Sequence, residues 1–195
     1  MKKSVLLLLT FVALLFSTYC FGQKEAKYFM YKAHSYIDNK DKTEEAFDNY
    51  VKAMRIAKNK KLVKEIARGM HTCSIYLGQE ADELSNKNAP NYKAAYLVSW
   101  EAFKSGEQKL NKKEINPYAM YVASKAALEL NKPREAQPYL EYLKRRSFGN
   151  AMVYAMLVDS YRVSNPKTAN AILEEGLSKF PKSLELLAIT EEMNM

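Results

Sequence analysis

The side chains that could do chemistry are few and lie far apart in the chain. There are two histidines, His34 and His71, and neither has a partner ligand at the spacing that a metal site requires. Acidic pairs such as Glu44-Glu45 are adjacent, so on a helix their carboxylates diverge, as on a solvated face. The sequence has no glycine-rich phosphate loop and no G-x-S-x-G motif. These observations predict a protein that is not an enzyme and that uses no cofactor and no metal.

The two cysteines do not suggest a disulfide. Cys20 lies in the N-terminal leader described below, which leaves Cys73 alone in the rest of the chain. Cys73 belongs to a stripe of apolar residues that recur at steps of three and four, which is one face of a helix. The stripe consists of Leu62, Ile66, Met70, Cys73, Leu77, Ala81 and Leu84. We therefore predict that Cys73 is a buried thiol without a redox or nucleophilic role.

The first 22 residues have the features of a secretory signal peptide. Lys2 and Lys3 give a positive start, and residues 5–16 form an apolar run that only Thr10 interrupts. This run is shorter than the roughly 20 apolar residues that span a bilayer. The sequence predicts a leader of residues 1–22 and one helical domain of residues 23–195.

The end of the leader can be read in more than one way. Cys20-Phe21-Gly22 fits a small-x-small site with cleavage before Gln23. Alternatives are acylation of Cys20, although bulky Tyr19 precedes it, and retention of the apolar run as an anchor. Export to the bacterial periplasm is the favoured location, with secretion or association with the outer membrane as alternatives.

The basic charge of the chain is spread over its length. The 30 lysines and arginines exceed the 22 acidic residues and give a net charge of +8. Basic and acidic residues are interspersed along the chain, with only short basic clusters such as Lys144, Arg145 and Arg146, as on solvated helix faces. An exported protein is a poor candidate for nucleic-acid binding, so we predict no nucleic-acid partner and only association with a membrane or a lipid anchor. The sequence leaves the oligomeric state open.

Helical periodicity dominates the sequence, and no segment alternates with a period of two. Glycine and proline are rare, with six of each, and they fall between the periodic segments. We expect nine helices, eight of them in antiparallel pairs with the ninth able to cap the last pair. The expected ranges are 25–37, 43–58, 61–86, 91–105, 117–130, 133–146, 150–163, 166–179 and 183–193.

The second helix of each expected pair repeats a pattern of small and apolar residues at steps of four and three. Small side chains at these positions let two helices approach closely. The four sets are Ala46, Tyr50 and Ala53; Ala95, Ser99 and Ala102; Ala136, Leu140 and Leu143; and Ala169, Leu173 and Gly176.

This pattern resembles the tetratricopeptide repeat family, whose unit is a helix–turn–helix of 34 residues. The last unit matches best, with Tyr154, Leu157, Val158 and Tyr161 in the first helix and Ala169, Leu173, Gly176 and Pro181 in the second. The leading tryptophan of the family motif is absent, and Trp100 lies in a second helix instead. The resemblance implies an all-α, right-handed superhelix of about four helix pairs plus a C-terminal capping helix. A helical bundle without repeats satisfies the same periodicity.

The family resemblance implies a scaffold whose first helices line a concave groove for a partner. Mapped onto this sequence, the groove lining is Met30, His34, Ile37, Ile75, Gln79, Asp82, Tyr118, Tyr121, Lys125, Ala155, Asp159 and Arg162. The expected partner is another protein of the cell envelope or a peptide segment of one. The same tyrosines could stack on sugar rings, so a protein that binds a glycan or a small ligand is the alternative. In a further alternative, acylation of Cys20 anchors the same scaffold in the outer membrane.

Overall fold

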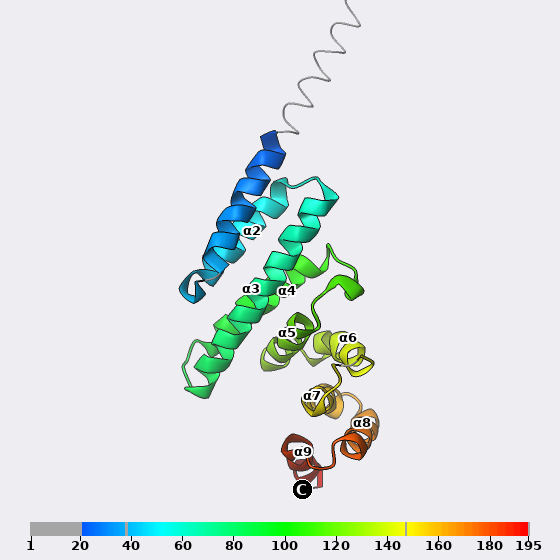
Figure 1. Cartoon of the computed structure of the whole chain (residues 1–195). Helices are drawn as coiled ribbons and strands as arrows, with labels where there is room; N and C mark the ends of the chain where they lie inside the picture. Colours follow the sequence, from blue (N-terminus) through cyan, green and yellow to red (C-terminus); the bar gives the residue numbers. More distant parts are fainter. Residues whose placement is uncertain (1–20, 38, 147, 195) are drawn as a thin grey trace, which may run out of the picture.

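The computed structural model describes residues 21–37, 39–146 and 148–194, and these residues are almost entirely helical. Within these ranges there are nine packed α-helices and no strand, so the predicted all-α class is confirmed. Residues 21–37 belong to the first helix, which is unlabelled in Figure 1. The others are α2 (Thr43–Ile56), α3 (Lys60–Asn86), α4 (Tyr92–Glu107), α5 (Pro117–Glu129), α6 (Pro133–Lys144), α7 (Ala151–Arg162), α8 (Pro166–Lys179) and α9 (Leu184–Asn194).

The polar gaps in the sequence supply the helix caps, and for this reason the predicted boundaries agree closely with the structure. An asparagine side chain accepts a backbone N–H of the first turn at the start of four helices, which satisfies a donor that has no partner within the helix. These caps are Asn59, Asn116, Asn150 and Asn165. Proline occupies the first helical position of α5, α6 and α8, where no backbone N–H is needed.

Two connections differ from simple polar turns. Lys40–Lys42 and Lys112–Glu114 form short 3-10 helices in segments that the sequence suggested only as gaps. Elsewhere, Asn88 and Asn131 adopt positive φ angles of 52° and 57°, each two residues after the end of a helix, α3 and α5 respectively. Asparagine tolerates this left-handed conformation better than most residues, so these two positions reverse the chain at modest cost.

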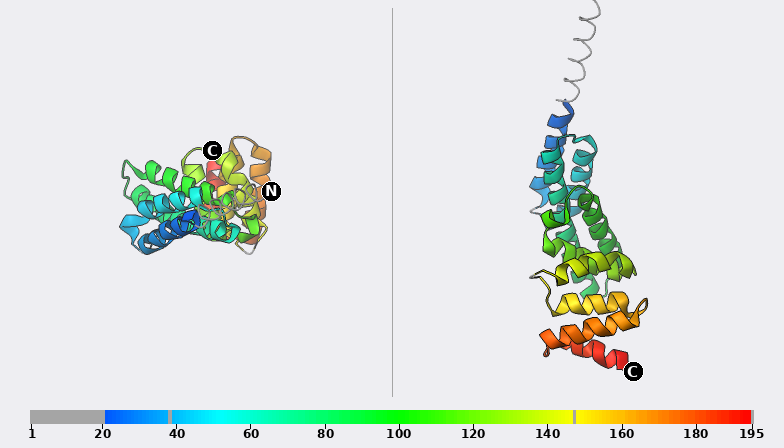
Figure 2. Two further views of the ribbon diagram at one scale, coloured as in Figure 1. Left: turned by 90° about the horizontal axis from the view of Figure 1, so that it is seen from above. Right: turned by 90° about the vertical axis from the view of Figure 1, so that its right-hand side faces the viewer.

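Successive helices pack against each other, and a second set of contacts links every other helix. α3 contacts α4, α5 contacts α6, and α7 contacts α8, as expected for antiparallel pairs. In addition, α3 contacts α5, α5 contacts α7, and α7 contacts α9. Figure 1 shows α3 and α4 along their length, whereas α7 and α8 are seen nearly end-on. In the right-hand view of Figure 2, α6 to α9 follow one another as layers toward the C-terminus.

The core consists of two hydrophobic clusters that meet at α3 and α4. The N-terminal cluster joins residues 21–37, α2 and the first part of α3, and it includes Ala102 of α4. The larger C-terminal cluster extends from Ala81 and α4 through α9. The small and apolar residues predicted from the repeats are all buried apart from the half-buried Ala95, and most of them belong to these clusters. Cys73 is completely buried and is a free thiol, as predicted.

Glycines let the long helices approach closely. A Cβ atom on Gly69 of α3 would lie 2.2 Å from the Tyr50 ring of α2, and one on Gly78 would lie 2.1 Å from Val122 of α5. Both distances are far below van der Waals contact, so a larger residue at either position would force the facing side chain to shift. In the described part of the chain, no helix is long and apolar enough to cross a membrane.

Candidate functional site

Two tyrosines of helix α5 form an aromatic pair. Tyr118 and Tyr121 lie one turn apart on α5, and their rings are stacked with centroids 6.0 Å apart. Tyr118 is 38% exposed, whereas Tyr121 is half-buried against the ring of Phe148 at 6.0 Å. Asn116 accepts the backbone N–H of Tyr118 and fixes the start of the helix that carries the pair. The pair therefore presents a flat ring surface on a rigid element.

Polar groups of α3 lie beside the tyrosine pair. Gln79 Nε2 donates to the hydroxyl oxygen of Tyr118 at 3.4 Å. Lys125 Nζ, one turn beyond Tyr121, pairs with Asp82 Oδ2 at 2.8 Å. The other oxygen of Asp82 accepts the Tyr96 hydroxyl of α4 at 2.5 Å. Five predicted groove residues thus lie together in two contact groups, Gln79–Tyr118–Tyr121 and Asp82–Lys125, and the charge of Asp82 also acts on Tyr121. We call these five residues the tyrosine face.

The electrostatics of the tyrosine face favour neutral phenols. Burial raises the pKa of Tyr121, and the carboxylate of Asp82 raises it further because a phenolate there would be repelled. Burial also raises the pKa of Tyr96, and the hydrogen bond that its hydroxyl donates to Asp82 raises it further. Asp82 and Lys125 each keep about a third of their side-chain surface exposed. The face can therefore offer ring surface, a neutral phenol and a paired charge, but it holds no activated nucleophile.

The predicted groove residues of the first helix lie elsewhere. Met30 is only 1% exposed and packs in the N-terminal cluster, so it is a core residue and not part of an open surface. Ile37 packs against the same cluster, and His34 lies edge-on to the Tyr50 ring with centroids 5.6 Å apart. Ile75 of α3 is half-buried against the C-terminal cluster and lines a hollow beside the start of α5. The apolar residues of the predicted groove lining are therefore packed against the hydrophobic clusters of the core.

The last three predicted residues belong to α7. Ala155 is buried, and Asp159 and Arg162 are exposed. Arg162 Nη1 pairs with Glu192 of α9 at 2.7 Å and lies 4.0 Å from Asp159. The ion pair of Arg162 with Glu192 links α7 to α9, so the guanidinium group already has a partner within the chain.

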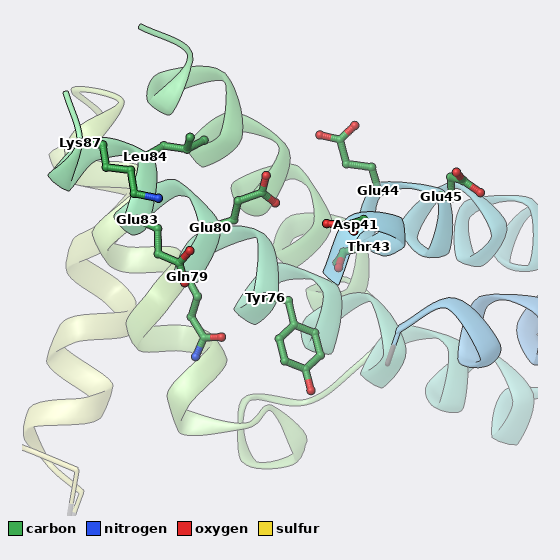
Figure 3. Close-up of a pocket in the computed structure, with 10 residues that line it drawn as sticks. All are labelled: Asp41, Thr43, Glu44, Glu45, Tyr76, Gln79, Glu80, Glu83, Leu84 and Lys87. Atoms are coloured by element: carbon green, nitrogen blue, oxygen red, sulfur yellow. The ribbon is translucent and has the colours of Figure 1, made fainter. Parts of the chain in front are cut away.

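A hollow with acidic walls lies next to the tyrosine face, and the sequence analysis did not predict it. Its volume is about 450 Å³, and it lies between the start of α2 and the second half of α3 (Figure 3). Its described lining residues are Asp41, Thr43, Glu44, Glu45, Tyr76, Gln79, Glu80, Glu83, Leu84 and Lys87. Burial raises the pKa of Glu80, and repulsion from Glu44, Glu83 and Asp41 raises it further. Gln79 belongs to both the hollow and the tyrosine face.

The sequence signal for this hollow was present but incomplete. Glu80 and Glu83 stand three residues apart on one helix, and Glu44 and Glu45 stand at the start of another. Only the packing of α2 on α3 brings the two groups to one place. The carboxylates nevertheless do not converge on a single point (Figure 3). Among the described residues, no three histidine, cysteine or acidic side chains could hold a metal ion.

The two groups with the most reactive chemistry are buried away from both surfaces. His71 of α3 is 2% exposed, stacks on Phe103 of α4 with centroids 4.9 Å apart, and has Nε2 3.2 Å from the Phe103 carbonyl oxygen. Burial lowers the pKa of His71 to about 4. Burial also raises the pKa of the Cys73 thiol to about 12. Both side chains are therefore neutral and enclosed at neutral pH.

Comparison of the chain with protein-family models, with curated proteins and with solved structures finds no match.

Proposed function

We propose that this chain is an exported, non-enzymatic scaffold that binds another protein of the cell envelope through the tyrosine face. The observation that carries the proposal is the contact between α3 and α5 at the tyrosine face. Gln79 and Asp82 lie at least 36 positions before Tyr118 in the sequence, yet they meet residues of α5 beside an aromatic pair in which Tyr118 is exposed and Tyr121 is half-buried. Exposed tyrosines supply rigid contact area with one polar tip, which is the chemistry that protein interfaces favour.

The helix contacts support a tetratricopeptide-like arrangement as the frame for this surface. In such a repeat, each first helix packs against its own second helix and against the next first helix. The contacts of α3 with α4 and α5, and of α5 with α6 and α7, have this order. α9 contacts both α7 and α8, as a capping helix would. We propose that α3, α5 and α7 are first helices of a right-handed superhelix and that the tyrosine face lies on its concave side.

The face suggests how a partner is recognised. A partner segment would cover the ring surface of Tyr118 and Tyr121 with an apolar side chain and exclude water from it. The Gln79 amide and the Asp82–Lys125 ion pair would fix the orientation of the partner by hydrogen bonds at the edge. Because the ion pair satisfies its own charges, it would contribute more to specificity than to affinity.

The test is crosslinking in living cells, with a photoreactive residue in place of Gln79 at the edge of the tyrosine face. The tagged full-length protein is purified from the envelope fraction, and its adducts are identified by mass. Tyr118→Ala/Tyr121→Ala removes the ring surface. Tyr142→Ala, a half-buried tyrosine on α6, makes the same chemical change away from the face and serves as the matched control.

One stoichiometric protein adduct that is lost in the double variant and kept in the Tyr142→Ala control would support the proposal. A protein that fractionates with the cytoplasm would contradict the proposed export. An exported protein without any adduct at the face would contradict the proposed interface. In that case, stabilisation of the purified protein by a sugar, abolished by the same double variant, would identify the glycan-binding alternative.

A further inference from the structure

The most exposed aromatic rings of the described chain lie on its first helix. Phe21 is 72% exposed, Tyr28 61% and Tyr31 62%, whereas Tyr118 of the tyrosine face is 38% exposed. Leaving three large rings in water is unfavourable, and contiguous exposed apolar surface commonly marks an interaction site. None of the functions proposed above uses these rings.

The three rings lie on the side of the helix that faces away from the core. Phe21 and Tyr28 are seven positions apart, which is close to two full turns, and Tyr31 lies nearly one turn further. Ala26, Met30 and Ala33 are completely or almost completely buried and form the opposite side of the same helix. Figure 1 shows this helix at the outer edge of the molecule, beside α2. The exposed side is therefore accessible along its length.

The charges on this helix are mostly positive. Lys24 and Lys27 are exposed and lie between the rings, and Lys32 is half-buried one residue beyond Tyr31. Glu25 is the one acidic residue in the range 21–37. Exposed aromatic rings with interspersed lysines are typical of helices that lie in the headgroup region of a membrane. The lysines complement the negative surface of anionic lipids.

The sequence also places this helix next to a membrane-seeking segment. Only four residues separate the apolar run of residues 5–16 from Phe21. Any lipid attached to Cys20 would lie one residue from the helix. Cleavage before Gln23 would remove Phe21 but leave Tyr28, Tyr31 and the lysines in the chain.

We propose that the exposed side of the first helix, formed by Lys24, Lys27, Tyr28 and Tyr31 and extended by Phe21 where the leader is retained, is a membrane-contact face. Its occupant is the headgroup layer of an anionic phospholipid bilayer, and the helix lies along the bilayer surface. The tyrosine rings enter the boundary between headgroups and acyl chains, and the lysine ammonium groups contact lipid phosphates. This inference rests on the proposed export, because export brings the helix to the membrane.

The first experiment locates the helix relative to the bilayer. The full chain is prepared with Trp100→Phe and with one tryptophan at position 28, 31 or 35, or at position 118 as the control. Vesicles of phosphatidylethanolamine and phosphatidylglycerol carry bromine atoms near the headgroup end of the acyl chains, which quench nearby tryptophan. We expect strong quenching at positions 28, 31 and 35, and little quenching at position 118.

The pattern of quenching decides the proposal. Quenching that falls steadily from position 28 to position 35 would indicate an upright helix and overturn the proposed orientation. Equal quenching at all four positions, no quenching, or no binding to the vesicles would overturn the membrane-contact face itself. If Trp100→Phe unfolds the protein, the same substitutions are made with Trp100 retained. Its 4% exposure keeps its own response to the quencher small.

The second experiment tests the charges. Each lysine near an anionic surface is worth about 1 kcal/mol, so Lys24→Gln/Lys27→Gln should weaken partitioning into these vesicles about 30-fold. Lys167→Gln/Lys182→Gln removes the same charge from two exposed positions at the other end of the chain and should change partitioning little. Equal effects of the two double variants would overturn the assignment of the face. Cell fractionation tests export separately, so failure of the lipid contact and failure of the proposed export remain distinguishable.

Discussion

The buried imidazole of His71 makes the stability of the protein depend on pH in a defined window. In the folded protein, the neutral ring donates its Nε2 proton to the Phe103 carbonyl oxygen at 3.2 Å and stacks on the Phe103 ring. Protonation would place a charge where water cannot reach it. Burial therefore lowers the pKa of His71 from an ordinary 6.5 to about 4, and this effect outweighs the opposing influences of the Phe103 carbonyl and Glu107.

The direction of the effect follows from proton binding. Between the two pKa values, the unfolded chain binds a proton at this position and the folded protein does not, so acid favours unfolding. The full contribution of His71 is present above pH 6.5 and is lost as the pH falls toward 4. The loss is about 2 kcal/mol at pH 5 and approaches about 3 kcal/mol near pH 4, from about 1.4 kcal/mol per pKa unit.

The measurement is urea unfolding of the full chain at several pH values between 7.5 and 4.5. His71→Gln keeps a side-chain N–H donor but cannot titrate, so the free energy of unfolding should lose this pH dependence in that variant. His34→Gln, on the first helix, is the matched control and should retain it. If His71→Gln keeps the full dependence on pH between 7 and 5, the reasoning about the buried imidazole is refuted.

Three further predictions concern packing, thiol reactivity and an ion-pair network. Gly69→Ala should destabilise the protein by about 1–3 kcal/mol in urea unfolding, because its Cβ would meet the Tyr50 ring at 2.2 Å. Gly22→Ala, compared in the chain that keeps residues 1–22, places a Cβ 3.5 Å from Ile56 and should be neutral or slightly stabilising; equal effects would contradict the packing argument. In a Cys20→Ser variant, Cys73 should react with a thiol reagent only after denaturation, because it is completely buried and burial raises its pKa to about 12; rapid labelling of this native variant would show that α3 opens locally. Hydrogen bonds from Lys179, Lys144 and Tyr154 lower the pKa of Glu175 to about 2, so its contribution to stability is present above pH 4.5 and is lost as the pH falls toward 2. Because Glu175 is about 40% exposed, Glu175→Gln should cost about 1 kcal/mol or less at pH 7, and a larger loss would indicate a network more rigid than its exposure suggests.

The helices could be predicted from the sequence because their signals are local. Periodic apolar residues mark the buried faces, and asparagine and proline residues mark the starts, so most expected boundaries lie within two residues of those in the structure. The burial of Cys73 followed from the same periodicity. The first helix extends at least four residues before its expected start at residue 25, because Phe21 to Lys24 are also helical.

The site was harder to predict because it depends on how helices pack against each other. Gln79 and Asp82 of α3 contact Tyr118 and Lys125 of α5, so these members of the predicted lining do lie together. The repeat pattern did not distinguish a surface position from a core position on the first helix, and it therefore included Met30. The acidic hollow was missed because Glu44 and Glu80 come together only through the contact of α2 with α3.

α3 connects the two surfaces that we propose. Its first half, from Leu62 to Cys73, packs in the N-terminal cluster that carries the membrane-contact face. Its second half carries Gln79 and Asp82 of the tyrosine face. A continuous helix of 27 residues is about 40 Å long, at about 1.5 Å per residue, and it packs closely against α2 and α5 at Gly69 and Gly78. If the first helix lies on the bilayer, α3 therefore holds the partner of the tyrosine face at a fixed place relative to the membrane. A substitution that bends α3 between Cys73 and Gln79 should then weaken partner capture in cells without changing the partitioning of the purified protein into vesicles.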